Sequence, residues 1–234
     1  MAREAQIGRG ALQAAGILAG LQQYLTDIYR TDHGLSLGDF LITDPAVAAV
    51  LGSDNLLPST QESVLLAQDK HGLALSVYLD PELLQRLERA DPMRSLRPQQ
   101  LDDFCKVLEG ISHFNYICWR ARQDKPVKLL ELEMQAEVDK FVAAWLLAVA
   151  QEDYALARHL HRWLFDDVRF SPELDPEQAE RYRAANEYAA RFCRGLAGRV
   201  HQNGAPDLAE LRHFYRLSQN EKISHINALA YGRS

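Results

Sequence analysis

The segment LEGISHFNYICW, residues 108–119, holds the side chains with the clearest capacity for chemistry in this chain. Glu109 and His113 are four residues apart, a spacing that places both on one face of an α-helix. Further along, Glu133 and Glu137 repeat this spacing in a second helical segment. Carboxylates and an imidazole that meet between facing helices can bind a divalent transition metal or exchange protons. These four residues are therefore the candidate metal ligands of the sequence.

The segments around these residues are expected to form an antiparallel helix pair. Apolar residues recur with helical periodicity over residues 99–122 and 127–151, which are separated by a short polar turn containing Pro126. Counting equal distances from this turn places His113 opposite Glu137. Glu137 also falls within the apolar arc of its helix, where a carboxylate needs a partner. This pairing predicts that His113 and Glu137 approach each other.

The same residues are also compatible with a purely structural role. Glu109 and His113 project away from the centre of the apolar arc of their helix, a position that Asn115 occupies. They would then form an exposed pair, and Glu137 would be a buried acid held by Asn115, Tyr116 or a backbone donor. The Glu-x-x-x-His spacing arises readily by chance, and neither helix carries the Glu-x-x-His spacing of di-iron bundles or an HExxH motif.

The remaining segments define the elements that must position these side chains. An apolar N-terminal stretch continues into LQQYLTDIYR, which predicts a helix. DFLIT predicts a short strand over residues 39–43, and ESVLLAQ and LALSVYL predict two strands around the turn DKHG. Asp80 and Pro81 begin a further helix. From Pro98 onward the periodicity is helical, over residues 99–122, 127–151, 153–165, 176–200, 207–217 and 219–230.

The expected fold is α+β and predominantly α, a helical bundle with a small N-terminal β-hairpin or three-stranded sheet. Residues 1–97 would supply the N-terminal helix and the small α/β layer, and residues 98–234 the helical bundle. Because the linkers between segments are short, the two parts are expected to form one continuous domain.

Composition limits the classes of partner. The 234 residues are 47% hydrophobic and 25% charged, as in an ordinary globular protein. Residues 1–154 hold 14 Lys+Arg against 22 Asp+Glu, and residues 155–234 hold 12 against 10, so binding of duplex nucleic acid is not expected. No segment approaches the ~20 apolar residues of a membrane span. Cys105, Cys118 and Cys193 form no CxxC motif, which favours reduced thiols and a cytoplasmic location.

Other patterns that could carry chemistry are weaker. His159 and His161 are two residues apart and point in different directions on a helix, so they cannot share one ion. Asp166 and Asp167 close a helix and are expected to be solvated. Arginines alternate with aromatic residues in RYRAANEYAARFCRG, but the acid in this run neutralises part of the face. No catalytic residue can be assigned from these patterns.

Two classes of function follow. The first is a cytoplasmic helical interaction or accessory protein that binds a protein partner or its own copy. Its C-terminal run, residues 211–232, is rich in apolar and aromatic residues and is expected to dock on the bundle and leave an aromatic edge for a partner. The alternative is a metal-dependent or acid–base helical enzyme that uses Glu109, His113, Glu133 and Glu137. Only this alternative requires a cofactor, a divalent transition metal.

Overall fold

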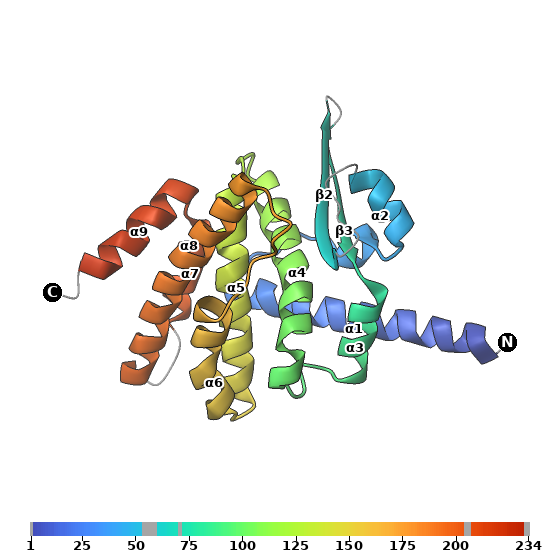
Figure 1. Ribbon diagram of the computed structural model, residues 1–234, viewed down its shortest axis with the longest axis horizontal. Coiled ribbons are helices and arrows are strands. Elements are labelled where there is room, and N and C mark those ends of the chain that lie inside the picture. Colours follow the sequence, from blue (N-terminus) through green and yellow to red (C-terminus); the bar gives the residue numbers. More distant parts are fainter. Residues whose placement is uncertain (1, 53–59, 70–71, 204–206, 232–234) are drawn as a thin grey trace. The chain divides into compact units, whose positions relative to one another are not determined.

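The structure, a computed structural model of the chain, describes residues 2–52, 60–69, 72–203 and 207–231 (Figure 1). It is mostly helical, with one three-stranded sheet in the N-terminal part, which confirms the expected α+β and predominantly α class. The chain forms two compact units. Unit 1 comprises Met1–Tyr24 and His33–Cys118, and unit 2 comprises Leu25–Asp32 and Trp119–Ser234. The domain boundary expected between residues 97 and 98 stays a prediction.

The sheet of unit 1 has the order β1–β3–β2, and its strands are β1 (Leu41–Ile42), β2 (Glu62–Asp69) and β3 (Gly72–Leu79). β2 and β3 form the predicted antiparallel hairpin, in which Glu62 lies opposite Leu79. β1 is parallel to β3, with Leu41 opposite Val77. Because alternate residues of a strand point to opposite faces, Glu62 and Val77 lie on the same face of the sheet.

The strand expected over residues 39–43 is shorter than predicted. Leu37–Phe40 form a 3-10 turn in which the N–H of Asp39 donates to the carbonyl of Ser36 at 3.1 Å. The N–H of the buried Leu37 donates to the side chain of Gln22 at 3.0 Å. These local acceptors take the backbone donors of the segment, so pairing with β3 begins only at Leu41.

A short helix, α2 (Pro45–Gly52), follows β1 and contacts both β1 and β2 (Figure 1). Asp44 begins this helix by accepting hydrogen bonds from the N–H groups of Ala46 (2.8 Å) and Val47 (3.4 Å). No pattern in the sequence predicts α2, because PAVAAVLG is apolar on every side and has no amphipathic period.

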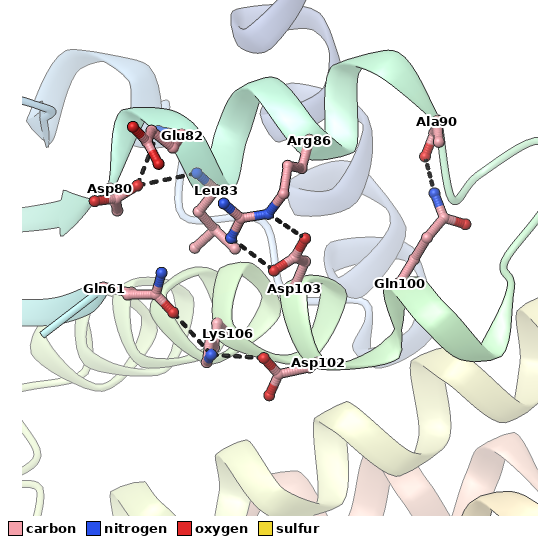
Figure 2. A network of polar contacts seen from close by, with 10 residues as sticks. All are labelled: Gln61, Asp80, Glu82, Leu83, Arg86, Ala90, Gln100, Asp102, Asp103 and Lys106. Carbon is pink, nitrogen blue, oxygen red and sulfur yellow. Dashed lines mark hydrogen bonds and ion pairs between the residues drawn. The ribbon is translucent and has the colours of Figure 1, made fainter. Parts of the chain in front are cut away.

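The next helices are α3 (Pro81–Arg89) and α4 (Leu101–Ala121), and Figure 2 shows the contacts that join them. Asp80 caps α3 by accepting hydrogen bonds from the N–H groups of Glu82 and Leu83, at 2.8 and 3.0 Å. Arg86 donates two hydrogen bonds to the Asp103 carboxylate on α4, at 2.7 and 2.8 Å. This bidentate pair fixes the direction of α3 against the first turns of α4.

Lys106 ties α4 to the sheet. Its ammonium donates to Asp102 on the same helix at 2.6 Å and to Gln61 Oε1 at 2.8 Å (Figure 2). Gln61 directly precedes β2, and its carbonyl accepts a hydrogen bond from the N–H of Asp80 at 2.8 Å. The beginning of β2 and the end of β3 are therefore held at one position along α4.

The remaining helices are α1 (Ala2–Tyr29), α5 (Leu129–Ala150), α6 (Tyr154–His161), α7 (Pro176–Asn203), α8 (Leu208–Arg216) and α9 (Gln219–Tyr231). In unit 2, α5 contacts α6 and α7, and α7 contacts α9 (Figure 1). A π-helical turn, Arg162–Asp166, continues α6. Among the described residues no strand follows Pro98, as the fold prediction requires.

Candidate functional site

Glu109 and His113 both lie on α4 in unit 1, and their potential ligand atoms are within 4.8 Å of each other. Glu109 is half-buried and His113 is buried. The exposed pair that the structural alternative requires is therefore wrong for His113. The apolar arc predicted from the sequence underestimates how many residues of α4 are buried, because residues outside this arc are buried as well.

Gly110 explains how closely the sheet approaches this side of α4. A Cβ atom at this position would lie 3.1 Å from Val77 Cγ1 and 3.2 Å from Glu62 Oε1. Contacts this short are rare for real side chains, so a larger residue would require the side chains of Val77 and Glu62 to shift by a few tenths of an ångström. The glycine within LEGISH thus permits contact between helix and sheet.

This close approach brings to His113 a carboxylate that no sequence pattern predicts. Glu62 Oε1 lies 3.9 Å from His113 Nδ1, and both side chains are largely removed from solvent. Glu62 is the first residue of β2. Nothing in its local sequence marks it as a partner of α4, because the contact depends on the packing of strand against helix.

Glu133 and Glu137 lie on α5 in unit 2. Glu133 is buried, with its Oε1 3.8 Å from Arg181 Nε. Glu137 is half-buried rather than buried, and it accepts a hydrogen bond from Lys140 Nζ at 2.7 Å. Glu137 thus has a partner within unit 2, as a carboxylate on this helix requires. That Glu109, His113, Glu133 and Glu137 share one site stays a prediction.

Asn115, in the middle of the apolar arc of α4, is the acceptor of a buried network in unit 1. Its Oδ1 accepts hydrogen bonds from Gln22 Nε2 at 3.1 Å and from His33 Nε2 at 3.0 Å. His33 Nδ1 accepts from the N–H of Leu35, so the imidazole proton lies on Nε2. Gln22 also donates to the Leu35 carbonyl at 3.0 Å. The network holds the segment after α1 in place, which is a structural role.

Residues 34–38, GLSLG, match the letters of a nucleophile elbow, but their structure differs from one. Ser36 precedes the 3-10 turn, whereas an elbow serine sits on a strained turn between a strand and a helix. Its backbone is extended, with φ −92° and ψ 129°. His33, the neighbouring histidine, is engaged with Asn115. These residues therefore give no support to a serine nucleophile.

A second buried group of polar side chains lies in unit 2, and we refer to it as the lysine cluster. Its members are each at most 4% exposed, and they are Arg120, Glu131, Gln135, Asp139 and Lys222. Arg120 Nη2 lies 3.3 Å from Glu131 Oε1. Gln135 Nε2 donates a hydrogen bond to Asp139 Oδ1 at 2.7 Å. Lys222 of α9 donates to Gln135 Oε1. α5 therefore supplies the acceptors that anchor α9.

Burial controls the acidity of Lys222. Loss of hydration lowers the pKa of its ammonium to about 7, although Glu131 and Asp139 act in the opposite direction. The Nζ atom also lies 4.4 Å from the centroid of the Phe214 ring, a cation–π contact. Such an amine can gain or lose a proton near neutral pH. Because Lys222 is fully buried, the arrangement supports a structural role rather than contact with a substrate.

The C-terminal helices dock within unit 2 as expected, but Phe214 and Tyr215 of α8 form no exposed aromatic edge. Phe214 stacks on Phe192 with ring centroids 3.9 Å apart, and Tyr215 stacks on Tyr29 at 4.2 Å. Both aromatic residues of α8 are almost fully buried. The expectation of exposed aromatic rings is therefore wrong for Phe214 and Tyr215, because these rings pack against α7 and the end of α1.

An apolar surface is instead exposed on α2 in unit 1. Val47, Val50 and Leu51 are 45%, 79% and 55% exposed, and we refer to them as the α2 stripe. Their spacing, i, i+3 and i+4, places them on one face of the helix. Ala48, in contrast, is only 1% exposed. α2 therefore presents most of its apolar side chains to solvent.

Comparison with known proteins identifies no relative: no family model, no curated protein and no solved structure matches the chain. Among the described helices, none combines the length and the apolar character that a membrane crossing requires.

Proposed function

We propose that the chain is an interaction or accessory protein that binds a protein partner through the α2 stripe. The observation that carries this proposal is the exposure of Val47, Val50 and Leu51 on one face of α2. Amphipathic helices commonly bind by laying side chains at i, i+3 and i+4 into an apolar groove. The cytoplasmic location expected from the three free cysteines belongs to the same proposal.

The charge of unit 1 indicates the chemistry of the partner. Unit 1 holds 8 Lys+Arg against 13 Asp+Glu, a net charge of −5, while unit 2 holds 18 against 19. α2 itself carries no charged residue, and the exposed Asp39 and Asp44 precede it. The complementary partner is an apolar groove with basic residues at its rim.

The size of the α2 stripe favours a partner protein with an apolar groove over a flat interface with a second copy of this chain. Burying the exposed parts of the three side chains contributes roughly 3–5 kcal/mol, from ~1.5–3 kcal/mol for each fully buried Val or Leu. A stable flat interface buries about 800 Å² on each partner, which three side chains do not supply. A groove that receives the exposed face of α2 can use them as anchors.

The test places a photo-reactive benzoylphenylalanine at position 50 and, as a matched control, at position 129. Leu129 is a similarly exposed leucine of unit 2. We expect one discrete crosslinked partner from position 50 only. A peptide of residues 43–52 should compete for it, and the same peptide with serine at positions 47, 50 and 51 should not.

Three outcomes contradict the proposal. Equal crosslinking from positions 50 and 129 would mean that exposure alone determines capture. A crosslink only between copies of this chain would identify self-association instead. An adduct that the wild-type peptide fails to displace would show that α2 is not the binding element.

The second candidate function is metal-dependent or acid–base chemistry that involves Glu109 and His113. The observation that favours it is the burial of His113 beside a carboxylate, Glu62, at 3.9 Å. Proton carriers and metal ligands both need such pairs in a partly desolvated setting. Glu133 and Glu137 remain candidate ligands on the basis of their spacing in the sequence.

A further inference from the structure

We propose that the outer edge of β2 is a docking site for an extended segment of a partner protein, apolar in its centre and basic at its ends. The segment would join the sheet of unit 1 as a fourth strand, beside β2 in the order β1–β3–β2. This edge is a different surface from the α2 stripe, and the proposal does not depend on the binding of a partner there.

The outer edge of β2 is open. β2 pairs with β3 along its whole length, from Glu62 opposite Leu79 to Asp69 opposite Gly72. In an antiparallel edge strand, every second residue directs its N–H and C=O groups away from the neighbouring strand. Within the part of the chain that the structure describes, no backbone group outside β3 pairs with residues 63–67. The outward groups can therefore form hydrogen bonds with an added strand.

β2 lacks the features that commonly prevent an edge strand from pairing with another chain. These features are lysines, prolines and bulges. The strand ESVLLAQD has no lysine or proline, its charged residues stand only at its ends, and its register with β3 is continuous. The other edge of the sheet is occupied at Val77 and Tyr78, which pair with β1. β2 is therefore the edge better suited to strand addition.

Apolar side chains line the middle of β2. Val64 and Leu65 are half-buried, and Leu66 is exposed. Leu66 lies opposite Leu75 of β3, which is also half-buried. Because successive residues of a strand point to opposite faces, Leu65 and Leu66 provide an apolar side chain on each face of the sheet. An added strand with an apolar centre would continue both faces.

Charge indicates the chemistry at the ends of the added strand. Unit 1 holds 8 Lys+Arg against 13 Asp+Glu, and an acidic residue begins and ends β2. The nearby Lys106, whose ammonium donates to Gln61 just before β2, is paired with Asp102 at 2.6 Å. Opposite charges on neighbouring strands stabilise their pairing. Basic residues at both ends of the partner segment therefore complement this edge.

The same charges disfavour a second copy of this chain as the occupant. A twofold antiparallel pairing of two β2 strands over their full length would place Glu62 of each copy opposite Asp69 of the other. Like charges directly opposite each other destabilise a sheet. Each copy would also bring the acidic excess of unit 1. A basic segment of another protein has neither disadvantage.

The experiment measures the binding of two synthetic peptides to the full-length protein. KTVIVTK has an apolar centre and basic ends, and ETVIVTE differs only in its acidic ends; both are acetylated and amidated. Fluorescence anisotropy of labelled peptides gives the Kd, and hydrogen exchange followed by NMR locates the site. We expect KTVIVTK to bind at least about 10-fold more tightly, because opposite charges replace like charges at both ends of the pairing. It should also slow exchange of the outward amides among residues 63–67.

Modified peptides test strand addition without changing the protein. Alternate residues of a strand direct their N–H groups to the same neighbour, so only one alternate set of peptide nitrogens can face β2. KTVIVTK is therefore methylated on either of its two alternate sets of backbone nitrogens. We expect methylation of one set to abolish binding and methylation of the other set to leave binding largely intact.

Matched variants place the peptide on β2. Leu66→Lys puts a positive charge at the middle of the edge and should weaken the binding of KTVIVTK at least about 10-fold, since lysine is a common protection of natural edge strands. Leu35→Lys makes the same change at another exposed leucine of unit 1 and should bind like the wild type. Circular dichroism establishes that both variants fold.

Three results would overturn the proposal. The first is a wild-type protein that fails to bind KTVIVTK, or that binds it with protection outside β2. The second is equal binding of KTVIVTK and ETVIVTE, or equal loss with both methylated sets. The third is protection of residues 63–67 that rises with protein concentration in the absence of peptide, which would assign the edge to a second copy. Because these measurements concern β2 alone, their failure leaves the crosslinking test of position 50 unaffected, and the reverse also holds.

Discussion

The side chain of Lys222 is fully buried in unit 2, and this burial changes its acid–base behaviour. Its ammonium is removed from water and donates a hydrogen bond to the Gln135 amide oxygen. The negative charges of Glu131 and Asp139 favour its protonated form. Arg120, which is paired with Glu131, adds a like charge that disfavours the protonated form. Burial therefore outweighs the acids and brings the pKa of Lys222 to about 7.

This shift predicts how stability depends on pH. A lysine in the unfolded chain has a pKa near ~10.4. Between pH 7 and 10 the unfolded state therefore binds more protons at Lys222 than the folded state does. The free energy of unfolding should rise through this range, with a slope of up to ~1.4 kcal/mol per pH unit. Urea unfolding of the wild type and of Lys222→Met, from pH 6 to 9.5, measures the contribution as their difference.

In Lys222→Met this rise should be absent, and below pH 7 the difference between the two proteins should stay constant. Measurements end at pH 9.5 because tyrosines begin to titrate above it; burial, with a smaller effect of Asp139, raises the pKa of Tyr29 in the folded state. Lys128→Met, at an exposed position, should leave the pH dependence unchanged. Parallel curves for the wild type and Lys222→Met would contradict the prediction.

At the residue scale, the sequence predicts pairs within one element but not contacts between elements. The four-residue spacing of Glu109 and His113 identifies their common face because helix geometry alone determines it. The proximity of Glu62 to His113 requires the close approach at Gly110, which no local pattern encodes. The burial of Lys222 is also not predicted by the sequence, because a single lysine near Ile226 in an amphipathic helix is usually solvated.

At the scale of elements, the helices from Pro98 onward agree with the periodicity to within a few residues. The predicted segment 127–151 is α5, Leu129–Ala150, and 219–230 is α9, Gln219–Tyr231. The periodicity and the polar turns between segments predict the positions of these helices even for α5, although α5 is buried on nearly every side. The periodicity fails for α2, which has no polar face, and for residues 39 and 40, which belong to a 3-10 turn instead of the predicted strand.

The cap of α3 gives a prediction at this scale. Asp80 accepts two backbone hydrogen bonds from the first turn of α3, and Pro81 occupies the first helical position. Asp80→Ala removes both acceptors and should lower the free energy of unfolding by about 1 kcal/mol. Urea denaturation followed by circular dichroism measures this change. Asp80→Asn is the matched control, because its amide oxygen can still accept.

Asp80→Asn should therefore recover most of the lost stability. Equal loss in both variants would show that the charge of Asp80, and not its capping geometry, stabilises α3. No loss in Asp80→Ala would mean that the bidentate pair of Arg86 with Asp103 holds α3 without the cap.

At the scale of the whole molecule, the two units differ in what they offer to other molecules. Unit 1 carries most of the net negative charge and the α2 stripe. Unit 2 is close to neutral, and the aromatic rings of α8 are buried within it. The proposed binding of a partner therefore concerns unit 1. The candidate metal ligands are divided, with Glu109 and His113 in unit 1 and Glu133 and Glu137 in unit 2.

The last prediction follows from this inward packing. Deleting residues 207–234 removes Phe214 from its stack on Phe192 and Tyr215 from its stack on Tyr29. It also removes Lys222 from the acids of the lysine cluster, which leaves buried charge less compensated. Loss of one buried Phe commonly costs ~3–5 kcal/mol, so losing both helices should approach the whole stability of a typical domain.

We therefore expect the truncated protein to bind the dye ANS and to lose cooperative unfolding of unit 2, seen as loss of near-ultraviolet circular dichroism. Phe214→Ser in the full chain should weaken unit 2 in the same direction, whereas Asn220→Ala, at an exposed position of α9, should not. Because the α2 stripe lies in unit 1, binding of the partner proposed for it should persist if unit 1 stays folded. A truncated protein as stable as the full chain would show that α8 and α9 contribute no essential part of the core.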